Sequence, residues 1–216
     1  MAKIKQGILG GFSGKVANVV GTSWKGRAVM KSQPLSVANP KTEAQQEQRG
    51  KFSKIAELAS AVLTQFVQPV ENPISGDISG YNLFCKDNKG AFDASGNVVK
   101  ANFVCGGGKI INIESVDATA SIVGSNIAIN WTNSEGLSAL RLNDKVYAVA
   151  VDTDAKNIFV LPSNVTRNDE GAQLERLKGE TALANAQKYI MVYAAVSADG
   201  RDVSVKTQAI ELTLEV

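Results

Sequence analysis

The sequence predicts an α+β protein with an N-terminal extended β-ribbon arm, a helical hairpin and a C-terminal antiparallel β-sandwich. Three observations indicate this class. Residues 1–42 contain six glycines and no Asp or Glu, the next segment has helical spacing of apolar residues, and strand-like patterns follow Asn97. We therefore divide the chain into an arm (1–38), a helical hairpin (39–96), a linker or strand (97–114) and a sandwich (115–216).

The arm has too few large apolar side chains to offset the entropy of ordering its glycines. Two short strands are expected at Lys15–Val20 and Arg27–Lys31, with Gly21–Gly26 as the connection. An isolated two-stranded ribbon is marginally stable in water. The arm is therefore expected either to insert into a neighbouring subunit or to pack on its own chain.

A helical hairpin is expected after Pro40, which is tolerated in a first helical turn. Thr42 and Gln45 form a capping-box pattern, and one helix is predicted from about Glu43 to Val67, with Pro69 as its end. The apolar positions with helical spacing are Phe52, Ile55, Ala59, Val62, Leu63 and Phe66. A second helix, capped by Ser79, is predicted to run to about Lys89 with Tyr81, Phe84 and Cys85 on one face.

The C-terminal half is expected to be built from short strands. Val146–Val151 and Tyr189–Val196 are almost continuously apolar, which is typical of strands buried on both faces. Ser197–Gly200 is a hairpin-turn pattern leading to Val203–Thr207. The other expected strands are Ile127–Thr132, Ile158–Leu161 and Ile210–Glu215. We expect Gly106–Gly108 to act as a flexible link between the helical and sandwich portions.

Composition argues against most catalytic chemistry. The chain has no histidine, the commonest general base and metal ligand, and its two cysteines cannot by themselves form a zinc site. Gly10–Val16 and Gly106–Ile110 depart from the phosphate-loop spacing and lack its hydroxyl residue. Asp152 and Asp154 are interpreted as turn residues rather than calcium ligands. We therefore predict no enzyme activity and no catalytic, cofactor-binding or metal site, with Cys85 and Cys105 as free, partly buried thiols.

Charge is divided unevenly along the chain. Residues 1–42 carry seven Lys or Arg and no acidic residue, while the whole chain has a net charge of only +2. A basic head on an acidic body can bind a polyanion or the acidic surface of a neighbouring copy. Residues 1–30 lack the apolar core of a secretory signal, and no window has the roughly 20 apolar residues of a membrane helix. We expect no membrane association.

Two resemblances add to these expectations. Trp131 on an early strand, Tyr147, and the Tyr-containing Tyr189–Val196 strand resemble a fibronectin type III or immunoglobulin-like module over about residues 115–216. The second resemblance rests on five segments: Gly7–Val16, Ser23–Gly26, Val29–Lys31, Asn39–Gln45 and Ser79–Asn82. They resemble a domain-of-unknown-function family of Bacteroidota and their phages. That resemblance implies a virion or assembly component and supplies no catalytic residues.

We expect a structural subunit of a phage-like particle, such as a neck, tail-ring or capsid-accessory protein, located in the virion or otherwise in the cytoplasm. Its partners would be copies of itself and other virion proteins, because each copy offers both a basic arm and an acidic body. An architectural nucleic-acid-binding protein and a surface adhesion module are the alternatives. The candidate contact residues are Lys3, Lys5, Lys15, Trp24, Lys25, Arg27 and Lys31.

Overall fold

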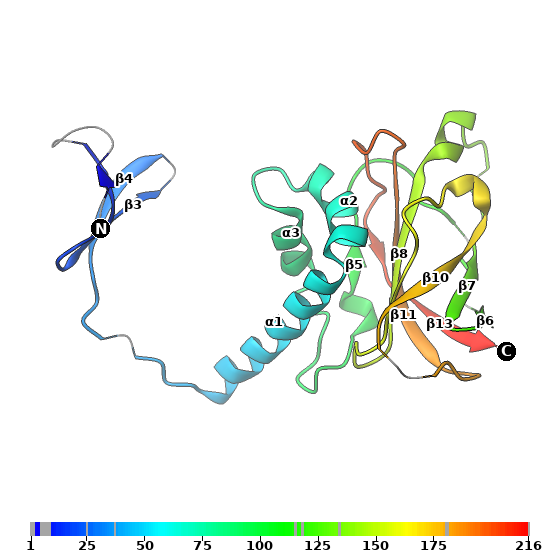
Figure 1. Cartoon of the computed structure of the whole chain (residues 1–216), viewed down its shortest axis with the longest axis horizontal. Helices are drawn as coiled ribbons and strands as arrows, with labels where there is room; N and C mark the ends of the chain where they lie inside the picture. Colours follow the sequence, from blue (N-terminus) through cyan, green and yellow to red (C-terminus); the bar gives the residue numbers. More distant parts are fainter. Residues whose placement is uncertain are drawn as a thin grey trace. The chain divides into compact units, whose positions relative to one another are not determined.

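The computed structural model describes residues 3–4, 10–24, 26–36, 38–114, 116–117, 119–133, 135–179 and 182–215. The chain divides into two compact units, residues 1–42 and residues 43–216. From here on, the arm means residues 1–42, slightly longer than the predicted 1–38, and the body means residues 43–216. The arm is a small sheet, and the body combines helices with a barrel (Figure 1). The predicted mixture of α and β structure is confirmed.

The arm is a four-stranded antiparallel sheet, in the order β1-β2-β3-β4. Its strands are β1 (Lys3–Ile4), β2 (Phe12–Val16), β3 (Val19–Trp24) and β4 (Arg27–Ser32). The predicted strand Lys15–Val20 is wrong, because these residues are divided between β2 and β3. The predicted connection Gly21–Gly26 is also wrong, because β3 continues to Trp24. The chain turns at Ala17–Asn18, with Ala17 in the left-handed region at a φ of 49°, and turns again before β4 at Gly26, at a φ of 77°.

Gly21 lies within β3 because the sheet leaves no room for a side chain at this position. A Cβ there would lie 2.3 Å from the carbonyl oxygen of Phe12 and 2.5 Å from its ring. Glycine is thus required by close packing across β2 and β3, not by a turn. It is the one buried residue in the described part of the arm.

Three α-helices pack on one side of the body (Figure 1). They are α1 (Glu43–Ala61), α2 (Gln68–Glu71) and α3 (Gly80–Asp87), with a π-helical turn, η1 (Leu63–Val67), between the first two. The expected N-cap is confirmed, because the Ser79 hydroxyl accepts a hydrogen bond from the Asn82 amide at 3.3 Å. Phe52, assigned to the buried face, is 58% exposed, so that assignment is wrong.

Pro69 does not end the first helical segment, which continues to Glu71. A proline inside an α-helix clashes with the carbonyl four residues earlier. Here the preceding turn is wider, since the Val67 amide donates to the carbonyl of Val62 and the Gln68 amide to that of Leu63. We attribute the tolerance of Pro69 to this wider turn.

The strands of the body close into a barrel in the order β10-β7-β6-β13-β11-β8-β9. Its members are β6 (Thr119–Val123), β7 (Asn126–Asn130), β8 (Lys145–Val151), β9 (Ile158–Val160), β10 (Gly171–Lys178), β11 (Lys188–Val196) and β13 (Ile210–Glu215). The expected antiparallel β-sandwich is therefore wrong. A parallel pairing of β6 with β13 and an antiparallel pairing of β9 with β10 join edges that a sandwich would leave open.

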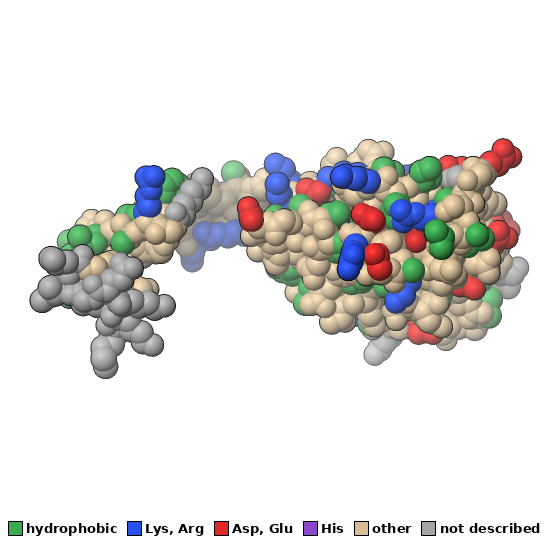
Figure 2. All heavy atoms as spheres, turned by 90° about the horizontal axis from the view of Figure 1, so that it is seen from above, with side chains coloured by type: hydrophobic (Ala, Val, Ile, Leu, Met, Phe, Trp, Pro, Cys, Tyr) green, Lys and Arg blue, Asp and Glu red, His purple; other side chains and the backbone are tan. Residues whose placement is uncertain are grey.

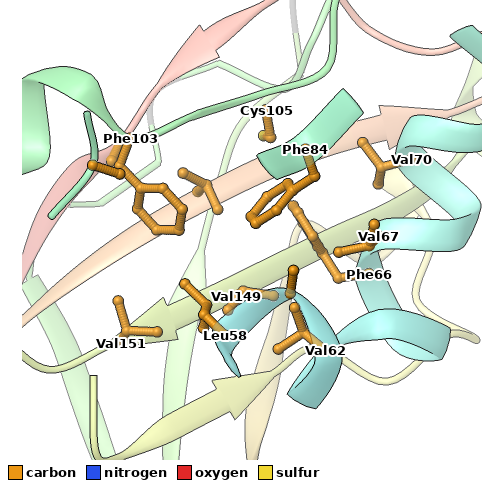
Figure 3. Packing of buried hydrophobic residues seen from close by; sticks show 14 of the residues in the cluster. Leu58, Val62, Phe66, Val67, Val70, Phe84, Phe103, Cys105, Val149 and Val151 are labelled. Carbon is orange, nitrogen blue, oxygen red and sulfur yellow. The ribbon is translucent and has the colours of Figure 1, made fainter. Parts of the chain in front are cut away.

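Two hydrophobic clusters stabilise the body, and β8 and β11 contribute to both. Val146, Ala148 and Ala150 belong to the cluster inside the barrel, whose members come from all seven strands. Tyr147 and Val149 alternate with them and belong to the cluster shared with the helices. Figure 3 shows Val149 in this cluster. This alternation confirms that β8 is buried on both faces and explains its apolar composition.

Gly106–Gly108 packs closely rather than forming a free linker. The amides of Gly107 and Gly108 donate to the Ser204 carbonyl at 3.1 and 2.9 Å. A Cβ on Gly108 would lie 2.0 Å from the Val203 carbonyl oxygen. The flexible-link prediction is wrong because a second, two-stranded sheet anchors this segment, formed by β5 (Val104–Cys105) and β12 (Thr207–Gln208).

Short 3₁₀ turns connect several of these elements. They are η2 (Asn72–Ile74), η3 (Lys100–Asn102), η4 (Ala139–Asn143) and η5 (Arg167–Asp169). The predicted Ser197–Gly200 turn is confirmed by a 2.8 Å hydrogen bond from the Gly200 amide to the Ser197 carbonyl. Among the described residues, no helix is both long enough and apolar enough to cross a membrane.

Candidate interaction surface

Strand pairing in the arm brings the predicted contact residues onto one face of the sheet. Lys15 of β2 is opposite Val20 of β3, which is opposite Lys31 of β4. Trp24 is likewise opposite Arg27. Directly opposed residues of an antiparallel pair project to the same face, and so do residues two apart on one strand. We call this surface the cationic face; its members are Lys15, Val20, Thr22, Trp24, Arg27, Val29 and Lys31.

The other face of the arm is mainly apolar. It carries Phe12, Val16, Val19, Ala28 and Met30, which alternate with the residues of the cationic face along their strands. Met30 is 71% exposed and Val16 is 53% exposed. We call this surface the apolar face. Exposed apolar side chains gathered in this way are typical of surfaces that contact another molecule.

The cationic face carries charge that its own unit cannot neutralise, because residues 1–42 contain no Asp or Glu. The smaller unit accordingly shows blue side chains and no red ones in Figure 2. Lys15 and Lys31 lie two strands apart, about 10 Å by ordinary sheet spacing. Trp24, at 63% exposure, adds a large amphipathic ring to the same face.

Four of the seven predicted contact residues are thus placed together: Lys15, Trp24, Arg27 and Lys31. Lys3 is in β1, where its backbone pairs with Ser13 of β2. Lys5 and Lys25 lie outside the described residues. Sequence reasoning found these residues by charge but missed their shared face. The spacing of Arg27, Val29 and Lys31, two residues apart along β4, indicates that they share a face. The register between β2 and β3, which places Lys15 opposite Val20, cannot be read from the sequence.

Several polar groups of the body have structural roles. The Asp152 carboxylate accepts hydrogen bonds from the amides of Lys156 and Asn157 at 2.7 and 3.1 Å, which confirms its interpretation as a turn residue. Cys85 and Cys105 are free and buried. Burial raises the pKa of the Cys105 thiol to about 12, so it stays protonated and unreactive at neutral pH. No cluster of three or more potential metal ligands occurs in the described part of the chain.

Comparison with known proteins identifies the family without supplying a function. Neither the curated proteins nor the solved structures contain a match to this chain. A model for a family of unknown function, DUF6266, matches residues 11–208, which includes most of the arm and nearly all of the body. The expected resemblance to a family without assigned activity is confirmed. The chain belongs to the DUF6266 family.

Proposed function

We propose that this protein is a non-enzymatic structural subunit that assembles through its arm. The observation that carries the proposal is the two-sided arm sheet, with Lys15, Arg27 and Lys31 on one face and exposed apolar side chains on the other. A sheet with so few buried residues gains stability when a second surface covers it.

Charge supports a second copy of the chain as the partner. Residues 1–42 have a net charge of +7, so the remaining residues of the chain, with a total of +2, carry −5. The cationic face of one copy therefore suits the acidic body of another. Such head-to-body contacts are heterologous and generate rings or filaments, depending on whether the rotation closes.

We further propose that the assembly is a phage-like particle, in which the subunit forms part of a neck, tail ring or capsid accessory and contacts other virion proteins. Support comes from the motif resemblance of the arm and the start of the body. The barrel would then face outward or pack beside its copies.

The proposal is tested by removing the charge of the cationic face. We expect the Lys15→Gln/Arg27→Gln/Lys31→Gln variant to associate ~3–150-fold more weakly, because the loss of three exposed charge pairs at ~0.2–1 kcal/mol each costs ~0.6–3 kcal/mol. Sedimentation velocity across a concentration series measures this. Association of the unmodified protein is also expected to weaken between about 50 mM and about 500 mM salt, because exposed charges are screened.

A matched control removes the same number of positive charges from the body. Lys156, Lys188 and Arg201 are exposed and pair with Asp154, Glu211 and Asp199. Their replacement by Gln is expected to leave association unchanged or to tighten it, since the body becomes more acidic. Equal weakening in both triple variants would contradict a specific role for the cationic face.

Nucleic-acid binding is the second candidate, and the grouping of three cations beside Trp24 favours it more than the dispersed sequence positions did. Cations contact phosphates and an aromatic ring stacks on unpaired bases. This function requires a monomer that binds nucleic acid with a log–log salt slope of about −2 to −3, for three phosphate contacts. The same triple variant would then lose nucleic-acid binding while the oligomeric state stayed unchanged.

A further inference from the structure

A small pocket in the body gathers positive charge at one end of the barrel strands. Its volume is about 230 Å³, and its lining residues are Lys109, Ile110, Ile111, Leu137, Arg141 and Arg167. Three of these six are cationic, and none is acidic. The pocket is distinct from the arm and belongs entirely to the body.

Arg167 is the unusual member of this group because it is fully buried. Its Nη2 donates to the carbonyl of Ile111, while its Nη1 has no hydrogen-bond partner among the described residues. Burial lowers the pKa of the guanidinium, but an arginine retains its charge at neutral pH. A buried charge with an unused hydrogen-bond donor destabilises the fold unless an anion or another acceptor pairs with that donor.

The carboxylate nearest to this guanidinium only partly compensates for its charge. Asp144 Oδ2 lies 3.6 Å from Arg167 Nε and 3.5 Å from Arg141 Nη1, so one carboxylate serves two guanidinium groups. Both distances exceed the roughly 2.7–2.9 Å of a strong charge-assisted hydrogen bond. With Lys109 included, three cations face one carboxylate, which leaves an excess of two positive charges.

The backbone around Arg167 is held by several hydrogen bonds. Its amide donates to the Asp144 carbonyl at 3.0 Å, and its carbonyl accepts from Asn133 Nδ2 at 3.0 Å and from Trp131 Nε1 at 3.4 Å. Thr166 and Asp169 form a capping box around the same turn. These contacts fix Arg167 against the pocket before any ligand arrives, which lowers the entropy cost of binding.

We propose that this pocket binds a compact oxyanion, either a carboxylate or a phosphate group. Arg167 and Arg141 supply hydrogen-bond donors in planar forks that match both groups, and Lys109 adds a third cation. Ile111, which is 59% exposed, and Leu137 provide apolar contact for a short hydrocarbon attached to the oxyanion. The site is independent of the proposed arm-mediated assembly.

The two tryptophans provide a built-in readout. The Trp131 indole N–H donates to the Arg167 carbonyl, whereas Trp24 lies in the arm. In ¹H–¹⁵N spectra of the full chain, assigned with a Trp24→Phe variant, we expect sodium phosphate and sodium butyrate to shift the Trp131 indole signal saturably. The expected Kd is ~1–10 mM. Sodium chloride at matched ionic strength is expected to cause little shift. The ratio of the two Kd values shows whether the pocket prefers a phosphate or a carboxylate.

Variants decide whether the named cations form the site. Arg141→Gln is expected to weaken binding about tenfold or more, because it removes a fork of donors from a partly exposed position. Arg201→Gln, at an exposed arginine that does not line the pocket, is the matched control and is expected to retain the affinity. If the Arg167→Met variant folds, its affinity tests the role of the buried cation. If that variant does not fold, the affinity of the Lys109→Gln variant tests the pocket instead. Equal shifts with chloride, or unchanged affinity in both Arg141→Gln and Lys109→Gln, would overturn the proposal.

Discussion

Replacing Glu71 with Gln is expected to stabilise the protein above pH 7 and to change its stability little near pH 5. Glu71 ends α2 and is only 2% exposed. Its Oε1 accepts a 3.2 Å hydrogen bond from the Gly106 amide, while Oε2 has no partner among the described residues. Burial raises the pKa of this carboxyl from 4.5 to about 7, and the nearby Asp87 carboxylate adds to the rise.

The direction of the pH dependence follows from proton binding. Between the unfolded pKa of 4.5 and the folded pKa of about 7, the folded state binds more protons at Glu71 than the unfolded state does. Stability from this group is therefore fully present below pH 4.5 and is lost as the pH rises through about 7. Each pKa unit corresponds to about 1.4 kcal/mol, so the total loss is about 3 kcal/mol.

Urea unfolding of both proteins at about pH 5 and about pH 8.5 measures the effect. Gln resembles the protonated carboxyl in shape and cannot ionise, so the difference between the two proteins isolates Glu71 from Asp87, Lys206 and the Cys105 thiol nearby. We expect the variant to gain about 3 kcal/mol relative to the unmodified protein across this range. A constant difference between the two pH values would show that Glu71 does not titrate as described.

Truncating Phe84 to Ala is expected to cost about 3–5 kcal/mol of stability. Phe84 is 1% exposed and lies between Phe66 and Phe103 in the cluster that joins the helices to the barrel (Figure 3). Its ring meets theirs edge to face, at centroid distances of 6.4 and 6.2 Å. The substitution leaves a cavity and removes both aromatic contacts.

Phe52→Ala is the matched control, because the same atoms are removed from an exposed position of α1. We expect this change to alter stability by less than about 0.5 kcal/mol. Denaturant midpoints of the two variants give the comparison directly. Similar losses in both would mean that the helices are not held against the barrel by this cluster.

Much of the body could be predicted because its signals are local. The apolar runs that form β8 and β11 indicate burial on both faces, and Ser79 marks the start of α3. By contrast, β10 has a single fully buried residue, Leu174, between exposed Gln173 and Glu175. Because charged residues of both signs interrupt its apolar pattern, β10 is not recognisable as a strand from the sequence. Closure of the barrel depends on the pairing of β6 with β13, which lie far apart in the sequence, and on the pairing of β10 with both β7 and β9.

The arm and the cationic pocket show the limit of local patterns more sharply. Ala17–Asn18 forms a turn without glycine, while Gly21 lies in a strand because of its neighbour Phe12. The shared face of Lys15, Arg27 and Lys31 depends on the register of β2 with β3 and of β3 with β4. Arg167 lies in a polar sequence that is typical of a turn. Its burial depends on contacts with residues distant in the sequence, among them the Ile111 carbonyl and the Asp144 carboxylate.

Removal of residues 1–42 tests the central claim most directly. Both hydrophobic clusters lie within residues 43–216, so the shortened chain retains its whole core and is expected to unfold in urea in one cooperative transition. Sedimentation velocity at matched concentrations compares it with the full chain. We predict a multimer for the full chain and a folded monomer without the arm. A shortened chain that still assembles, or a full chain that stays monomeric at every concentration and salt tested, would contradict assembly through the arm.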